Sequence, residues 1–159
     1  MEFRQMLRSK QQLPMEECVE ILQTQLRGVL SVLGDGGYPY GIPMNHWYNP
    51  EDGKLYFHCG LSGHKLDAIR GCDKASFCVL DEGTPLENHW ALQFRSVVVF
   101  GRIRMVEDVQ EVERIAHQLS LKFTQDEAYI AQEIRSALKR TACFVLEPEH
   151  ISGKRVKES

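Results

Sequence analysis

The sequence predicts a largely antiparallel β-barrel with flanking helices, that is, a β-rich α+β fold. Six segments carry the short apolar runs or the alternation of buried and exposed residues that are typical of strands. Most of these segments are joined by short turns, which leave no room for the crossover helices of a parallel sheet. The chain has 159 residues, of which 43% are hydrophobic and 26% charged, which suits a single domain with a substantial core.

The composition excludes several classes of protein. The net charge of −3 argues against broad binding to nucleic acids or membrane surfaces. No apolar run approaches the ~20 residues that a membrane-spanning helix needs, and the N-terminus lacks the apolar segment of a secretory signal. We therefore expect a cytoplasmic protein with reduced thiols. The five cysteines are an odd number without a C-x-x-C pair, which argues against a disulfide framework.

The first half of the chain is predicted to contain one amphipathic helix followed by three strands. These elements are expected at residues 14–26, 28–33, 38–48 and 55–59. Glycines at positions 34, 36 and 37 mark a turn between the first two strands. Pro39 and Pro43 lie inside the second strand and cannot donate a hydrogen bond to a neighbour. This strand should therefore be irregular, be bulged or lie at an edge of the sheet.

The second half is predicted to contain a short helix, two strands, two further helices and a last strand. These elements are expected at residues 63–70, 75–80, 90–106, 108–119, 124–138 and 142–146, with a loop at 81–88. The two later helices begin with the capping-box pairs Asp108/Glu111 and Thr124/Glu127. The polar residues after position 146 should be loosely held, with the tail from about residue 150 only partly ordered. We expect residues 1–159 to form a single domain.

The most informative segment is the predicted start of the short helix. Ser62 is a candidate N-cap, and His64 and Lys65 follow directly in the first turn. Cations in a first turn oppose the helix dipole, so they are disfavoured there unless an anion is bound. Free amides, an imidazole and an ammonium would then converge on one phosphate. Two interpretations remain open, a phosphate site and a solvated helix start.

A second set of candidate residues lies on the second and third predicted strands, which a hairpin makes neighbours. Pro43 interrupts the ladder, so nearby backbone amides are free to face either a flat heterocyclic ligand or water. His58 alternates with the apolar Phe57 and should point to the opposite face. Cys59 and His58 then face opposite ways, which argues against a zinc site and against a Cys/His nucleophile pair. We predict no metal site.

Taken in order, these segments resemble the flavin-binding split-barrel superfamily of pyridoxamine 5′-phosphate oxidase, and within it the 5-nitroimidazole resistance (Nim) proteins. The matching segments are residues 37–45, 55–59, 63–69, 76–79, 94–101 and 151–154. The resemblance implies a six-stranded antiparallel split β-barrel with flanking helices. It also implies a homodimer with FMN bound in each of two sites at the subunit interface.

The resemblance places the cofactor along several of these segments. Together with Ser62 of the helix start, the implied cofactor-binding residues are Ile42, Pro43, Met44, Asn45, His46, His58, Gly63, His64, Lys65, Arg95, Ser96 and Lys154. Residues 42–46 would lie along the isoalloxazine ring through backbone groups, and residues 63–65 would bind the phosphate. Arg95 and Ser96 would reach the flavin of the other subunit, whereas the role of Lys154 is not assigned.

The function implied is electron transfer from reduced FMN to a small electron-poor acceptor such as a nitroimidazole. His58 is the candidate catalytic residue, because an imidazole can donate a proton near neutral pH. One alternative is a non-catalytic flavin- or haem-binding module. Another is an enzyme similar to pyridoxamine-phosphate oxidase, which is disfavoured because the late Trp-x-Arg element of those oxidases is absent.

Overall fold

The structure, a computed structural model, describes residues 1–157. The strands are β1 (Arg27–Leu33), β2 (Pro39–Asn45), β3 (Trp47–Asn49), β4 (Lys54–Cys59), β5 (Lys74–Leu80), β6 (Thr84–Pro85), β7 (Leu92–Val106) and β8 (Ala142–Lys157). The helices are α1 (Met15–Thr24), α2 (His64–Gly71), α3 (Val109–Leu121) and α4 (Glu127–Ala137), with 3-10 turns η1 (Ser9–Gln11), η2 (Asp35–Gly37) and η3 (Leu138–Arg140).

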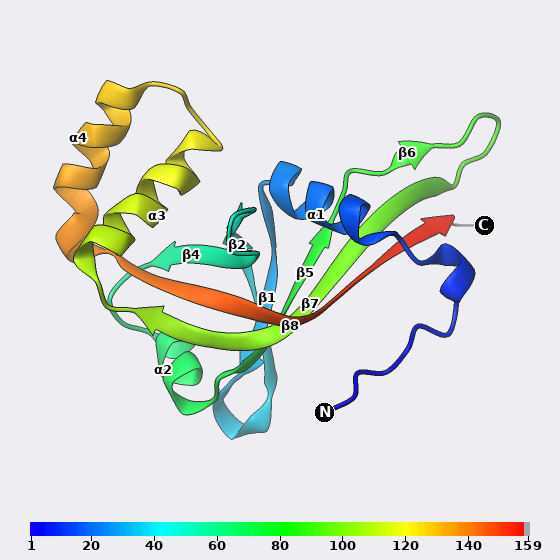
Figure 1. The fold of residues 1–159 in the computed structure, drawn as a ribbon, viewed down its shortest axis with the longest axis horizontal. Coiled ribbons are helices and arrows are strands. Elements are labelled where there is room, and N and C mark those ends of the chain that lie inside the picture. Colours follow the sequence, from blue (N-terminus) through cyan, green and yellow to red (C-terminus); the bar gives the residue numbers. More distant parts are fainter. Residues whose placement is uncertain (158–159) are drawn as a thin grey trace.

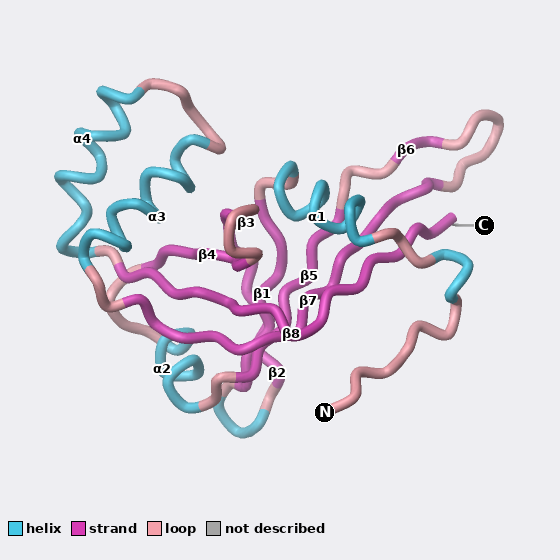
Figure 2. Tube along the Cα trace, in the orientation of Figure 1, coloured by secondary structure: helices cyan, strands magenta, loops and turns pink. Residues whose placement is uncertain are grey.

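All the strands belong to one antiparallel sheet in the order β2-β1-β5-β7-β8-β4-β3, with β6 paired to β7. The sheet curls strongly into a half-barrel, and the helices lie around it (Figures 1 and 2). The predicted α+β class and antiparallel split barrel are confirmed. The sheet has eight strands rather than six, because the predicted second strand divides in two and a short β6 forms inside the predicted 81–88 loop.

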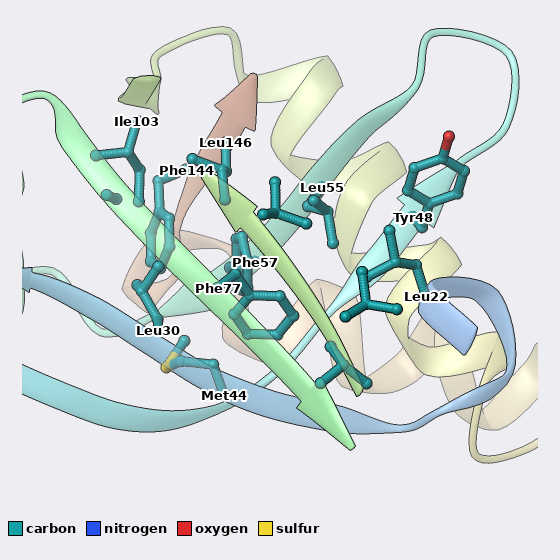
Figure 3. Close-up of a cluster of buried hydrophobic side chains, with 14 of the residues drawn as sticks. Leu22, Leu30, Met44, Tyr48, Leu55, Phe57, Phe77, Ile103, Phe144 and Leu146 are labelled. Atoms are coloured by element: carbon teal, nitrogen blue, oxygen red, sulfur yellow. The ribbon is translucent and has the colours of Figure 1, made fainter. Parts of the chain in front are cut away.

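The main core fills the inside of the curl. Phe57 of β4 packs edge-on against Phe77 of β5 at 5.1 Å between ring centroids and stacks on Phe144 of β8 at 4.9 Å (Figure 3). Ile21 and Leu22 of α1 close one end of this core and are fully buried. Burying one large apolar side chain contributes about 1.5–3 kcal/mol to folding. The aromatic cluster shared by β4, β5 and β8 is therefore a main source of the half-barrel's stability.

A second, smaller core forms where α3 packs on the opposite face of β4 and β8. Tyr56 and Val145 are buried against Ile115 of α3. The Arg114 guanidinium lies over the Trp47 ring at 5.0 Å, which ties α3 to the β3–β4 hairpin. α4 packs against α3, and the two form a helical hairpin that stands off the sheet beside β4 (Figure 1).

The polar tail is part of the sheet, which corrects the expectation that it is loosely held. β8 continues to Lys157 and pairs with β7 along nearly its whole length. The register shifts between Phe100 and Gly101. A side chain at position 101 would meet the Glu147 carbonyl and Pro148, so only glycine fits this close approach. Without this partner, β7 would expose a long row of unpaired backbone groups. Pairing with that edge explains why a polar segment forms a strand.

The predicted second strand is broken at His46, whose side chain is completely buried. Its Nε2–H donates to the Leu22 carbonyl at 2.7 Å, and the Lys122 ammonium donates to the His46 carbonyl. The imidazole also packs edge-on against Phe77. β2 and β3 are the two ends of the sheet order, so the edge position that the prolines predicted is confirmed.

The helix caps follow the predicted signals only in part. Asp108 caps α3 by accepting from the Gln110 amide at 2.9 Å, as predicted. α4 is capped by Asp126 rather than by Thr124, because the Asp126 carboxylate reaches the Tyr129 amide at 3.0 Å. Thr124 instead accepts from the Asp126 amide, so it shapes the turn that leads into the helix.

Candidate functional site

A surface pocket of about 560 Å³ opens where β2, β4 and α2 approach the end of α4. Its walls are Pro43, Met44, Asn45, His58, Cys59, Gly60, Lys65, Ala137, Arg140 and Thr141. We call it the edge pocket, because β2 forms an end of the sheet. The structure thus brings together five of the residues predicted to bind a cofactor: Pro43, Met44, Asn45, His58 and Lys65.

The edge pocket carries a positive charge from Lys65 and Arg140. The Lys65 ammonium lies 3.3 Å from the Met44 sulfur, which is only a weak acceptor. Within residues 1–157, no carboxylate pairs with either cation. Because neither cation is paired, both are available to form charge-assisted hydrogen bonds with an anionic ligand.

The start of α2 supplies backbone amides beside Lys65. Gly63, not Ser62, is the N-cap, so the predicted Ser62 cap is wrong. Gly63 has φ of 129°, a conformation that suits glycine and turns the chain into the helix without a side-chain cap. Its carbonyl accepts from the Leu66 and Asp67 amides at 3.0 and 3.2 Å. The preceding amides, those of His64 and Lys65, have no intrahelical partner.

The His64 side chain does not line the edge pocket. Its ring stacks on Tyr40 at 4.3 Å, and its Nε2 accepts from the Asp35 amide at 3.1 Å. The imidazole therefore fastens α2 to the turn between β1 and β2. Any contact of His64 with a ligand in the edge pocket has to come from its backbone amide.

His58 is the best-placed titratable group of the pocket. It alternates with the buried Phe57 and is itself exposed, as the sequence predicted. Surrounding protein atoms and the nearby Lys65 lower the pKa of His58 below its usual value. The ring is therefore mostly neutral at neutral pH and carries one N–H donor and one free acceptor.

The remaining predicted residues lie outside the edge pocket. Ile42 packs against the main core, and the His46 imidazole is buried within it. Ser96 and Lys154 face each other across β7 and β8. Arg95 donates to Asp81 at 2.9 Å and to Glu17 at 3.4 Å, so it ties β7 to α1. We call Arg95, Ser96 and Lys154 the strand-end group.

The sequence did not point to three walls of the pocket: Ala137, Arg140 and Thr141. Ala137 is the last residue of α4, and Arg140 and Thr141 come shortly after it, far from His58 in the chain. A cation near a helix C-terminus is expected from the helix dipole alone, so Arg140 gave no signal of a ligand site. Pairing of β8 with β4, which sets Ala142 opposite Cys59, and the packing of α3 on β4 bring this segment to the pocket.

Over residues 1–157, no three His, Cys, Asp or Glu side chains cluster closely enough to hold a metal ion. None of the helices in that range has the length and apolar character needed to cross a bilayer.

Comparison with known proteins places the chain in a family. Residues 14–155 match the family described as pyridoxamine 5′-phosphate oxidase. No protein of curated function matches the sequence. A proposed 5-nitroimidazole antibiotic resistance protein of Bacteroides thetaiotaomicron has a similar structure, with a TM-score of 0.79 at 17% identity over 92% of this chain and 87% of that one.

Two FAD-binding proteins share the same fold. The protein from Mesorhizobium loti has a TM-score of 0.65 at 23% identity, over 91% of this chain and 96% of that one. The protein from Mycobacterium smegmatis has a TM-score of 0.66 at 19% identity, over 93% of this chain and 99% of that one. Because the family match spans most of the sequence, this chain belongs to the pyridoxamine 5′-phosphate oxidase-like family of flavin-binding split barrels.

Proposed function

We propose that the protein binds FMN in the edge pocket and passes electrons from the reduced flavin to a small electron-poor acceptor such as a nitroimidazole. Family membership supports a flavin, and the similar Bacteroides thetaiotaomicron protein supports this class of acceptor. The observation that carries the proposal is the meeting of two unpaired cations, Lys65 and Arg140, with the start of α2 in one pocket.

The phosphate of FMN fits the charge at this end of the pocket. A phosphate monoester carries close to two negative charges, which Lys65 and Arg140 would balance. The unpaired amides at the start of α2 would donate to its oxygens, and the helix dipole favours the same sign of charge. A terminal phosphate monoester suits such a site better than the internal pyrophosphate of FAD, which is why we propose FMN.

The isoalloxazine ring would lie along β2. Pro43, Met44 and Asn45 line the pocket on β2, which pairs with β1 on one side only, so that its outward-facing backbone groups have no partner strand. The volume of about 560 Å³ is within the range of about 300–1,000 Å³ that is typical of cofactor sites. When bound, the flavin would supply the redox chemistry, while the protein holds and orients it.

His58 would serve the acceptor rather than the cofactor. A nitro group that takes two electrons and two protons becomes a nitroso group and water, so a nearby donor favours the reaction. The neutral imidazole can donate its N–H to the acceptor oxygen as negative charge builds there. We propose this hydrogen bond as the catalytic role of His58.

We also propose a homodimer with the flavin at the subunit interface. The outer face of the sheet exposes Val29, Leu80 and Phe100, of which 42%, 56% and 42% are accessible. A patch of this kind favours burial against another chain. The strand-end group does not line the edge pocket of its own chain, but in a dimer it could complete the pocket of the partner. Sedimentation should give a dimer at micromolar concentration, and a monomer that still binds FMN would exclude the shared site.

Two measurements test the proposed function: the visible absorption spectrum of the protein with flavin, and the rate at which a nitroimidazole reoxidises the bound flavin. The purified protein, reconstituted with FMN, should show flavin absorption that stays with it through gel filtration. After reduction by dithionite, adding a nitroimidazole should restore the oxidised spectrum faster than with free FMN. Bound flavin that reoxidises no faster than free FMN would indicate a binding module without catalysis.

A further inference from the structure

A second and smaller cavity is lined by His58 of β4 together with residues of α3, of α4 and of the segment that follows α4. Figure 1 shows the hairpin that α3 and α4 form. The cavity has a volume of about 170 Å³, close to that of an engineered apolar cavity of about 150 Å³ that holds benzene. It shares His58, Ala137 and Thr141 with the edge pocket, so the two spaces adjoin. We call it the hairpin cavity.

Apart from the imidazole of His58, the polar groups of the hairpin cavity present hydrogen-bond acceptors. The Ser120 hydroxyl donates its proton to the Ala116 carbonyl at 2.8 Å, and the Thr141 hydroxyl donates to the Ala137 carbonyl at 2.9 Å. Both oxygens keep lone pairs but have no proton left for a ligand. Glu133 adds a carboxylate, which only accepts. A ligand that brings N–H donors would satisfy these groups, whereas a nitro group would not.

The charges of the two spaces are opposite. The edge pocket carries Lys65 and Arg140, whereas the hairpin cavity carries Glu133. Throughout the part of the chain that the structure describes, no cation pairs with Glu133. Opposite charge would therefore direct an anionic cofactor to one space and a cationic ligand to the other.

We propose that the hairpin cavity binds the ammonium or other N–H-bearing end of a small aromatic acceptor, whose electron-poor end then lies beside His58 at the edge pocket. This inference rests on the proposed function and narrows its substrate class. The preferred acceptors are nitroarenes with an aminoalkyl substituent rather than unsubstituted nitroarenes. Apolar walls such as Ile134 and Leu138 would hold the ring.

Binding is tested first, without any redox step, by NMR titration of benzylamine and its acceptor-only counterpart benzonitrile. Benzylamine should bind about tenfold more tightly or better, as one charge-assisted contact implies, and should shift the His58 and Ser120 signals. Glu133→Gln should remove this preference, and Ala116→Leu should fill the cavity and abolish binding. Ala128→Leu, the same change at an exposed position of α4, should alter neither. Equal binding of the two probes, or binding that Ala116→Leu leaves unchanged, overturns the inference.

Turnover then separates this inference from the proposed function. With FMN bound and reduced, 4-nitrobenzylamine should have a kcat/KM about tenfold above that of 4-nitrotoluene, and Glu133→Gln should equalise the two. Rapid turnover of both compounds without that preference overturns the hairpin cavity as a subsite and leaves the proposed function standing. Binding of benzylamine by a protein that takes up no flavin contradicts the proposed function and, with it, the role of the cavity as an acceptor subsite.

Discussion

His46 and His58 lie on two neighbouring parts of one sheet, in opposite surroundings. The ring of His46 is completely buried, its Nε2 is bonded to Leu22, and Phe77 packs against it. The ring of His58 is exposed, and it forms a wall of two adjoining cavities. The inner region is apolar apart from this imidazole, whose Nδ1 is buried without a hydrogen-bond partner, whereas the edge pocket has accessible cations, amides and an imidazole that a ligand can reach. We therefore expect substitutions in the inner region to lower the stability of the fold, and substitutions in the edge pocket to weaken ligand binding.

The largest predicted effect is a loss of stability on substitution in the inner region. Phe57→Ala removes a fully buried ring that packs against Phe77 and Phe144, and should lower the free energy of unfolding by about 3–5 kcal/mol. Leu61→Ala, in the exposed loop before α2, should change it by about 0.5 kcal/mol or less. Denaturant unfolding of both variants measures the difference. Similar losses for the two would show that the ring cluster does not dominate stability.

The next effect is acid destabilisation through His46. Burial, followed by the nearby Lys122, lowers the pKa of His46 to about 3 in the folded protein, well below its value of about 6.5 in an unfolded chain. The unfolded chain therefore binds the proton preferentially, and stability falls as the pH drops from about 6.5 toward 3, by at most about 1.4 kcal/mol per pH unit.

Unfolding measured between pH 7 and 5 tests this effect above the range in which most carboxylates titrate. His46→Gln, which cannot ionise, should show a shallower slope over the same range. If the variant and the wild type have equal slopes, the pH dependence comes from other groups.

A binding effect of about tenfold or more is expected at the edge pocket. Lys65→Ala removes a half-buried cation from the proposed phosphate site, and a hydrogen bond to a charged group contributes about 1.5–3 kcal/mol. FMN affinity, measured by quenching of flavin fluorescence, should fall while stability stays nearly constant. Lys74→Ala, at an exposed position of β5 outside the pocket, is the matched control. Equal affinities for the two variants would remove Lys65 from the site.

The smallest effect concerns the rate of acceptor reduction. His58→Ala should keep FMN bound but slow reoxidation by a nitroarene about two- to tenfold, the range expected for one neutral hydrogen bond. Stopped-flow absorbance on the loaded protein measures this rate, and His89→Ala in an exposed loop is the control. Reoxidation at the wild-type rate would make His58 only a wall of the pocket, and loss of FMN would assign it to binding.

Local patterns predicted the elements whose structure depends on nearby residues. β1, β4, β5 and α2 lie within one or two residues of their expected positions, because apolar spacing and turn glycines determine them. β8 was expected to end at residue 146, since its second half is polar. Its continuation depends on the exposed edge of β7, which no local pattern reveals.

The candidate site was predictable to a similar degree. The segments that hold Pro43 to Asn45, His58 and Lys65 carry recognisable motifs, and the structure brings them to one pocket. Arg140 and Thr141 come from a distant helix end, so only tertiary packing reveals them. The turning of His64 toward Asp35 and the burial of His46 also depend on contacts between elements far apart in the sequence.

The central claim is that the edge pocket binds a flavin through its phosphate, and parallel titrations with FMN, riboflavin and FAD test it most directly. The protein should bind FMN at one per chain and at least about tenfold more tightly than riboflavin, because only FMN offers a phosphate to Lys65, Arg140 and the start of α2. FAD should bind more weakly than FMN. Equal affinities for FMN and riboflavin, or no binding of any flavin, would contradict the claim.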